Sequence, residues 1–156
     1  MPFQLVIAAD APTRQSISVT LAEKQQHLAD TLAVIPDPQE RLAIVVDRAK
    51  KLPPLADHER TDAQLVRGCI SRVHLAAELR DGRCHFRADA DSPLVRGLVA
   101  LLCEFFSGLT PAEISATDAD PLAELDLTQN LSPTRQNGLA SIRATIRAFA
   151  EKNLAA

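Results

Sequence analysis

Residues 73–90 have the sequence VHLAAELRDGRCHFRADA, and this stretch decides the fold. Apolar and polar residues alternate on both sides of Asp81-Gly82, which is typical of two β-strands that each bury one face. Asp-Gly between two such runs is a strong signal for a two-residue hairpin turn. We therefore predict an antiparallel hairpin. Because a lone hairpin is marginally stable, we also expect a third strand around Ala63–Arg67.

Helix starts are marked by a hydrogen-bond acceptor followed by proline, a pair that caps the helix and occupies its first turn. The pairs are Asp37-Pro38, Ser92-Pro93, Thr110-Pro111, Asp120-Pro121 and Ser132-Pro133. Together with hydrophobic spacing and a capping box at 20–23, they predict long helices at about 21–35, 38–51, 93–107 and 133–153. The helix at 93–107 is apolar nearly all round and is expected to be central. The sequence thus predicts an α+β domain with helices on one face of a small antiparallel sheet of about three strands.

Composition excludes several classes of function. Seventeen Lys and Arg against 20 Asp and Glu give a formal charge of −3, and five Phe are the only aromatic residues, which argues against a nucleic-acid binder. Three cysteines fit reduced thiols better than a disulfide framework. We find no signal peptide or membrane span. We therefore expect a cytoplasmic protein without membrane or nucleic-acid partners, with a flexible leader at 1–18 and one domain at 19–156.

Cys69 is the strongest candidate for chemistry. It lies in a Gly68–Ser71 segment between the expected third strand and the strand that begins near Arg72, and such loops present reactive side chains. Gly68 permits backbone conformations that other residues avoid, and the cations Arg67 and Arg72 favour a thiolate. A free cysteine is also commonly a small buried hydrophobe, and spacing alone leaves both interpretations open.

The other two cysteines are predicted to be packing residues. Cys84 shares the apolar strand face, and Cys103 lies in the apolar helix. With Cys69, His74 and His85 they could instead form an iron–sulfur or zinc scaffold, which is the alternative class of function. No CxxC or paired-histidine spacing supports that alternative, and both histidines are expected on the strand face opposite Cys84. We therefore predict no metal site, and the missing CxxC also argues against a thiol oxidoreductase.

Arg135 falls in the first turn of the last predicted helix, where a cation opposes the helix dipole. Two interpretations remain open. The side chain is either a solvated arginine or one that is directed at a partner or an anionic sulfur, a common role for arginine.

Six short stretches also occur in a characteristic order. They are KLPPL (51–55), VRGCISRV (66–73), FRADAD (86–91), VRGL (95–98), GLTP (108–111) and LSPTRQNGL (131–139). Together they resemble the SufE/CsdE family of cysteine desulfuration proteins, the sulfur acceptors of type II cysteine desulfurases. The resemblance extends from about Pro36 to Phe149 and implies a SufE-like fold, similar to that of the iron–sulfur scaffold IscU.

The resemblance also implies a function. Cys69 matches the cysteine that carries the persulfide, Asp91 matches the second acid of an Asp-Ser-Asp run, and Arg135 matches an arginine of the C-terminal signature. A protein of this kind is a sulfur carrier and desulfurase activator in iron–sulfur cluster assembly rather than an enzyme. It needs no cofactor of its own, because the SufS/CsdA-type desulfurase supplies pyridoxal phosphate. A downstream scaffold such as SufBCD then receives the sulfur.

The chain departs from the usual Gly-Cys-Gln-Ser-Gln-Val-Trp motif of this family. Ile70, Arg72 and His74 replace the two glutamines and the tryptophan, and Ala90 replaces the serine of the acidic run. These positions adjoin the cysteine, where a desulfurase would dock. We therefore expect the partner-binding or persulfide-supporting residues to be Gly68, Arg67, Arg72, His74, Asp91 and Arg135.

Overall fold

The computed structural model describes residues 19–68 and 72–154. The elements are α2 (Leu21–Leu28), the π-helical turn η1 (Ala29–Ala33), α3 (Pro38–Ala49), the 3-10 turn η2 (Asp57–Glu59), β2 (Val73–Arg80), β3 (Arg83–Ala90), α4 (Pro93–Phe106), α5 (Pro111–Ala116), α6 (Pro121–Glu124) and α7 (Pro133–Lys152). The predicted leader at 1–18 lies outside the described residues, and so do Cys69, Ile70 and Ser71.

The predicted hairpin is confirmed. β2 and β3 pair antiparallel over their full lengths, with Leu79 opposite Cys84. Asp81 and Gly82 both have positive φ angles, 54° and 77°, as a two-residue hairpin turn of the primed type requires. Because the two strands alternate between a core face and an outer face, Cys84 is buried while His85 beside it is only partly covered.

The predicted third strand is wrong. Among the described residues the sheet has two strands, and Leu65 forms only an isolated bridge with His74. A turn closes just before it, where the Gln64 amide donates to the Thr61 carbonyl at 3.0 Å. Gly68, with φ +90°, then redirects the chain. The two turns leave too few extended residues between them for a strand.

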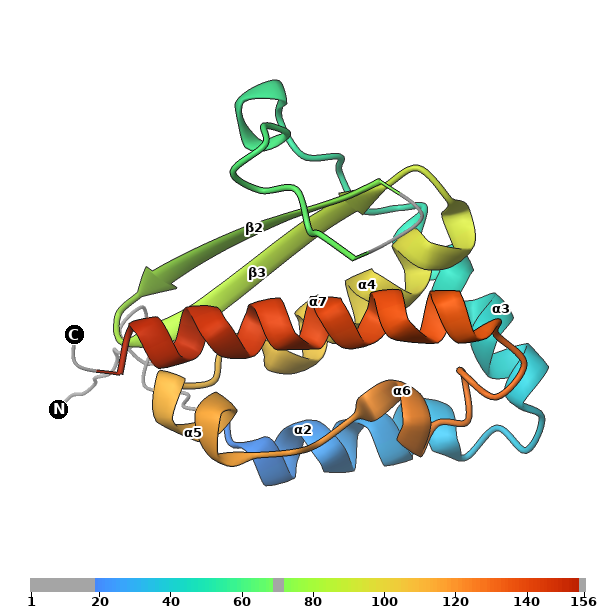
Figure 1. The fold of residues 1–156 in the computed structure, drawn as a ribbon. Helices are drawn as coiled ribbons and strands as arrows, with labels where there is room; N and C mark the ends of the chain where they lie inside the picture. The colour runs from blue at the N-terminus through green and yellow to red at the C-terminus, as the bar shows by residue number, and fades with distance from the viewer. Residues whose placement is uncertain (1–18, 69–71, 155–156) are drawn as a thin grey trace, which may run out of the picture.

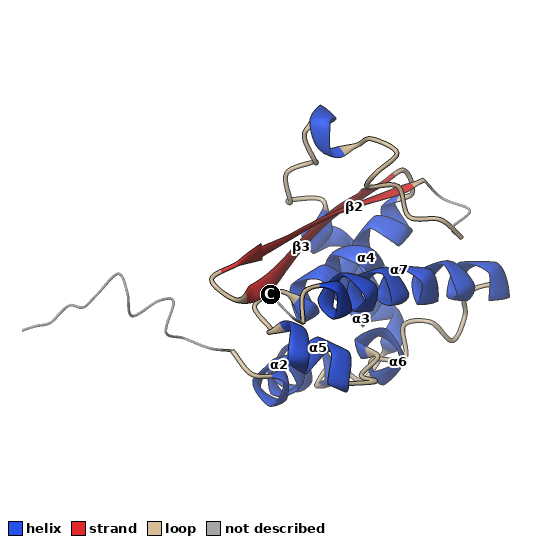
Figure 2. Ribbon diagram, turned by 60° about the vertical axis from the view of Figure 1, so that its left-hand side comes forward, coloured by secondary structure: helices blue, strands red, loops and turns tan. Residues whose placement is uncertain are grey.

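The helices lie on one face of the hairpin, as predicted (Figures 1 and 2). α4 packs against β3 on one side and α3 on the other, and α7 runs beside α4. The opposite face of the hairpin carries the loop that contains η2 (Figure 1). The core therefore lies between the sheet and the helices, with α4 at its centre.

α4 has the central position that its composition predicts. Nine of its residues are buried: Val95, Gly97, Leu98, Val99, Leu101, Leu102, Cys103, Phe105 and Phe106. At Gly97 the backbone of α3 comes so close that an added Cβ would lie 2.9 Å from the Cα of Val46. An edge-to-face contact between Phe86 and Phe149, with ring centroids 5.7 Å apart, joins the sheet to α7.

The predicted helix starts are also confirmed. Each of the five acceptors before proline receives a backbone N–H bond from the first turn of its helix: Asp37, Ser92, Thr110, Asp120 and Ser132. The first helix differs from the prediction because it widens into the π-helical turn η1. Within residues 19–68 and 72–154, none of the helices combines the length and apolar character that crossing a bilayer requires.

Candidate functional site

Gly68 places the segment that leads to Cys69 against the middle of α7 (Figure 1). An ideal Cβ at this position would lie 2.6 Å from the Ser141 hydroxyl oxygen, closer than real Cβ contacts. The φ angle of +90° lies in a region that residues with a Cβ rarely adopt. Glycine is therefore required at residue 68 by conformation and by contact, and Cys69 follows directly in the sequence.

Gly68→Ala is expected to lower the free energy of unfolding by about 1–3 kcal/mol, because it adds backbone strain and overpacking together. Urea denaturation of the two proteins measures this. Adding Ser141→Gly to Gly68→Ala removes the close contact and leaves the strain, so it should restore part of the loss. A Gly68→Ala protein that is as stable as the wild type would contradict the described geometry.

Three of the predicted site residues meet at one place. Arg72, His74 and Asp91 line an open hollow at the start of β2, together with Pro54, Arg60, Asp89 and Ala90. The Asp91 amide donates to the Arg72 carbonyl at 3.2 Å, which joins the end of β3 to the residue before β2. The hollow is thus lined by three basic and two acidic side chains.

Asp89 organises this hollow, and sequence reasoning missed it. Its carboxylate accepts the Leu55 amide at 3.3 Å and lies 3.7 Å from Arg60 and 3.4 Å from Arg96. Only 16% of the Asp89 side chain is exposed. Arg60 and Arg96 in turn donate to the Leu55 and Leu52 carbonyls. The network therefore fastens the 52–55 segment to the end of β3. The only sequence signal for it is the first acid of the FRADAD stretch.

Arg135 and Arg67 lie outside the hollow. The Arg135 amide donates to the Ser132 hydroxyl at 3.2 Å in the first turn of α7, and its side chain is exposed. Arg135 precedes Ser141, the contact of Gly68, by six residues, which is about 9 Å along the helix axis. Arg67 is exposed beside Gly68. The structure thus places both arginines close to the Gly68 contact and does not bring them to Asp91 or His74.

Cys84 and Cys103 lie in the core, as predicted for packing residues. Their exposed fractions are 0% and 4%. Burial raises the pKa of both thiols, and the pKa of Cys103 reaches about 12. A buried thiol with a raised pKa is a poor nucleophile and a poor ligand.

The ligands that a metal scaffold would need are separated. On the outer face of the hairpin, His74 pairs with Asp89 and His85 with Glu78, so the histidines are four strand positions apart and opposite the buried Cys84. Across 19–68 and 72–154, no three His, Cys, Asp or Glu side chains form a group that could hold a metal ion. This part of the chain offers no set of ligands for the scaffold alternative.

Comparison with protein-family models identifies the family. Residues 26–150 match the model described as "SufE: Fe-S metabolism associated domain". The chain belongs to the SufE family. The match covers the helices, the hairpin and the segment that contains Cys69, and this SufE domain is associated with iron–sulfur metabolism.

Known SufE-like proteins support this assignment. An uncharacterized SufE-like protein of Synechocystis sp. is 33% identical over 140 residues, which are 90% of this chain and 83% of that protein. An uncharacterized SufE-like protein of Rhizobium etli is 35% identical over 134 residues, which are 83% of this chain and 90% of that protein. The solution structure of a hypothetical protein from Thermus thermophilus has the same fold, with a TM-score of 0.69 at 19% identity, over 85% of this chain and 97% of that one.

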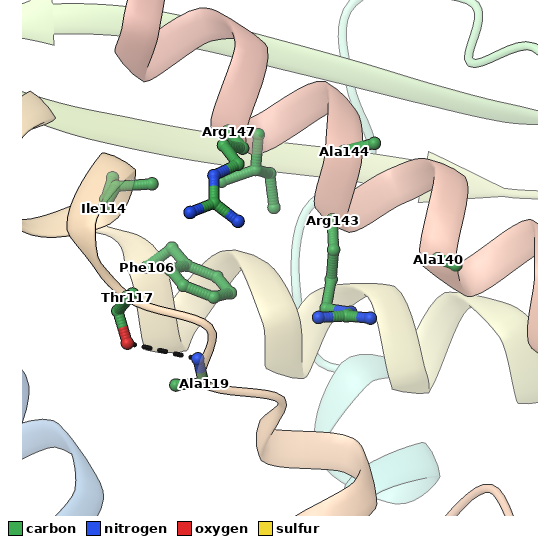
Figure 3. Close-up of a pocket in the computed structure, with 9 residues that line it drawn as sticks. Phe106, Ile114, Thr117, Ala119, Ala140, Arg143, Ala144 and Arg147 are labelled. Carbon is green, nitrogen blue, oxygen red and sulfur yellow. Dashed lines mark hydrogen bonds between the residues drawn. The ribbon is translucent and has the colours of Figure 1, made fainter.

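This SufE-family chain has a second pocket on the other flank of α7. Figure 3 shows it between α5 and α7, with a volume of about 200 Å³. Its floor is apolar, and the two arginines that line it each contact a carboxylate. Arg147 lies 3.3 Å from Asp118, and Arg143 lies 3.6 Å from Asp120. The pocket therefore has no arginine free of a carboxylate, and it includes none of the predicted site residues.

Proposed function

We propose that this SufE-family protein is a sulfur acceptor and carrier, which takes persulfide sulfur from a cysteine desulfurase onto Cys69. The burial of the other two thiols is the observation that carries the proposal. Cys84 and Cys103 lie in the core with raised pKa values. Neither is available to an enzyme the size of a desulfurase, so Cys69 is the remaining candidate.

The chemistry is a thiol exchange in which a sulfur atom is transferred. The desulfurase uses pyridoxal phosphate to take sulfur from free cysteine and holds it as a persulfide on its own cysteine. The Cys69 thiolate attacks the terminal sulfur, the sulfur–sulfur bond of the desulfurase persulfide breaks, and the desulfurase thiolate leaves. Cys69 then carries the persulfide, and no external oxidant or reductant is needed. The cations Arg67 and Arg72 favour the attacking thiolate.

This exchange also accounts for activation of the desulfurase. Removing the persulfide restores the desulfurase thiolate for the next turnover, so the carrier acts as an activator without being an enzyme or binding a cofactor. The loaded protein passes its sulfur to a scaffold such as SufBCD for cluster assembly in the cytoplasm. Partner choice depends on the residues around Cys69, where this chain has Arg72 and His74 in place of the usual glutamine and tryptophan.

Intact mass spectrometry tests the proposal. The protein is mixed with a SufS-type or a CsdA-type desulfurase and free cysteine. We expect the mass of one sulfur atom to be added, and treatment with a reductant to remove it. Failure to add sulfur with both types of desulfurase, while each enzyme remains active on free cysteine, would refute the proposal.

Thiol alkylation provides an independent prediction. At pH 8 a thiol with a pKa of about 12 is ionised in roughly one molecule in ten thousand, so Cys103 should react very slowly in the folded protein. We expect iodoacetamide to modify one cysteine rapidly under native conditions, namely Cys69, and all three after unfolding in guanidinium. Peptide mapping by mass spectrometry identifies the modified residue. Rapid native modification of Cys84 or Cys103 would remove the main support for Cys69.

A further inference from the structure

Acidic residues are unevenly distributed along the chain. Twenty Asp and Glu in 156 residues amount to about one in eight positions, yet residues 63–77 and 127–150 contain none. These are the two longest acid-free runs of the sequence. The first run includes Arg67 and Arg72, and the second includes Arg135. A protein with a net charge of −3 therefore has two local stretches with only positive charge.

The fold brings the two runs together. Gly68 in the first run packs against Ser141 in the second, where an ideal Cβ would lie 2.6 Å from the serine hydroxyl. β2 begins above the same half of α7 that starts at Pro133 (Figure 1). The exposed side chains of α7 near this contact, Thr134, Asn137 and Thr145, are uncharged. The joined surface thus has arginines and neutral polar groups but no carboxylate from either run.

The arginines of this surface differ from the other arginines of the chain in their partners. Among the twelve arginines in residues 19–68 and 72–154, eight form ion pairs with carboxylates: Arg41, Arg48, Arg60, Arg80, Arg87, Arg96, Arg143 and Arg147. Arg83 donates to the Gly108 carbonyl at 2.6 Å. The remaining three, Arg67, Arg72 and Arg135, have no side-chain hydrogen bond or ion pair within the described part of the chain, and all three are exposed.

The contrast along α7 is informative. Arg143 and Arg147 belong to the same acid-free run, but their side chains lie on the flank that faces α5 and α6 (Figure 3). There Asp120 and Asp118, from outside the run, neutralise them. No such carboxylate reaches Arg135 from any described segment. The fold therefore neutralises arginine on one flank of α7 and leaves it unneutralised near the Gly68 contact.

We infer that Arg67, Arg72 and Arg135, here called the arginine rim, form a docking surface for carboxylates on an acidic face of the partner protein. The inference rests on the proposed function, in which that partner is the desulfurase. Guanidinium groups bind carboxylates through paired hydrogen bonds, and complementary charge directs two proteins into register. Because the whole chain is negatively charged, an acidic partner is attracted only at this rim. With so few aromatic residues for stacking, a nucleic acid is disfavoured as the ligand.

Binding to a SufS-type desulfurase tests the rim. Interferometry with immobilised desulfurase is run at about 50 mM and about 300 mM NaCl, since exposed charges are screened at the higher concentration. We expect Arg67→Glu, Arg72→Glu and Arg135→Glu each to weaken binding about tenfold at low salt, and the salt to reduce this difference. Lys152→Glu makes the same charge change on an exposed residue at the far end of α7 and should alter binding less than about twofold. Equal effects of Lys152→Glu and the rim variants would overturn the inference.

A second measurement separates this inference from the proposed function. Polyglutamate is titrated into ¹⁵N-labelled protein, and shifts should concentrate at Arg67, Arg72, Arg135 and their neighbours. If the desulfurase neither binds nor loads Cys69 but polyglutamate perturbs the rim, the proposed partner is wrong and the rim is supported. If Cys69 is loaded while the rim variants bind normally and polyglutamate perturbs nothing there, only the rim is refuted. Tighter binding of a single-stranded oligonucleotide than of polyglutamate would also refute it.

Discussion

Cys69→Ser is expected to abolish sulfur loading completely. A serine hydroxyl is almost entirely protonated near neutral pH and cannot form a persulfide, so the acceptor reaction has no substitute nucleophile. Stimulation of the desulfurase should disappear with loading, because the desulfurase persulfide is no longer removed. Intact mass after incubation with desulfurase and free cysteine measures the first effect, and alanine release from free cysteine measures the second.

The matched controls are the same substitution at the two buried cysteines. Cys84→Ser and Cys103→Ser each place a hydroxyl in the core, which should cost about 1–3 kcal/mol of stability. Both variants should nevertheless accept one sulfur atom at temperatures where they remain folded. Sulfur bound to the Cys69→Ser protein, or loading lost only in the folded Cys84→Ser or Cys103→Ser protein, would assign the acceptor to a different thiol.

Asp89→Ala is expected to produce the largest loss of stability among the site substitutions, about 2–4 kcal/mol. The change leaves two arginines without their carboxylate and the Leu55 amide without its acceptor. Because these contacts fasten residues 52–55 to β3, the loss should be concentrated there. Urea denaturation measures the total, and amide hydrogen exchange should accelerate most at Leu55.

Asp91→Ala provides the matched control, two residues further along the same stretch. Asp91 is exposed, and its described hydrogen bond uses the backbone amide, so its removal should change stability by less than about 0.5 kcal/mol. Equal losses in the two variants would show that Asp89 does not hold the network. A loss at Asp89 without faster exchange at Leu55 would show that the 52–55 segment is fastened by other contacts.

Local sequence signals predicted most of the secondary structure because each acts within a few residues. The five acceptors before proline mark helix starts, and Asp81-Gly82 marks the hairpin turn, since capping and turn geometry depend on neighbouring backbone atoms alone. The apolar composition of α4 predicts its central position for a similar reason, because such a helix is stable only when covered on every side.

The parts of the site that sequence reasoning missed depend on distant residues. Asp89 gains its role from Leu55, 34 residues earlier, and Gly68 from its contact with Ser141 on α7. The third strand was predicted from the general instability of hairpins, but turns on both sides of Leu65 reduce it to a single bridge. No local periodicity contains this information.

The sequence by itself determined the helices, the hairpin, the SufE resemblance and the choice of Cys69, because those features are read from adjacent residues or from motifs in order. Tertiary structure decided which charges remain free. Arg135 and Arg143 lie on the same helix within the same acid-free run, and only the fold provides Asp120 to one of them and no described carboxylate to the other. Neutralising a charge requires a partner within a few ångströms in space, wherever that partner lies in the sequence.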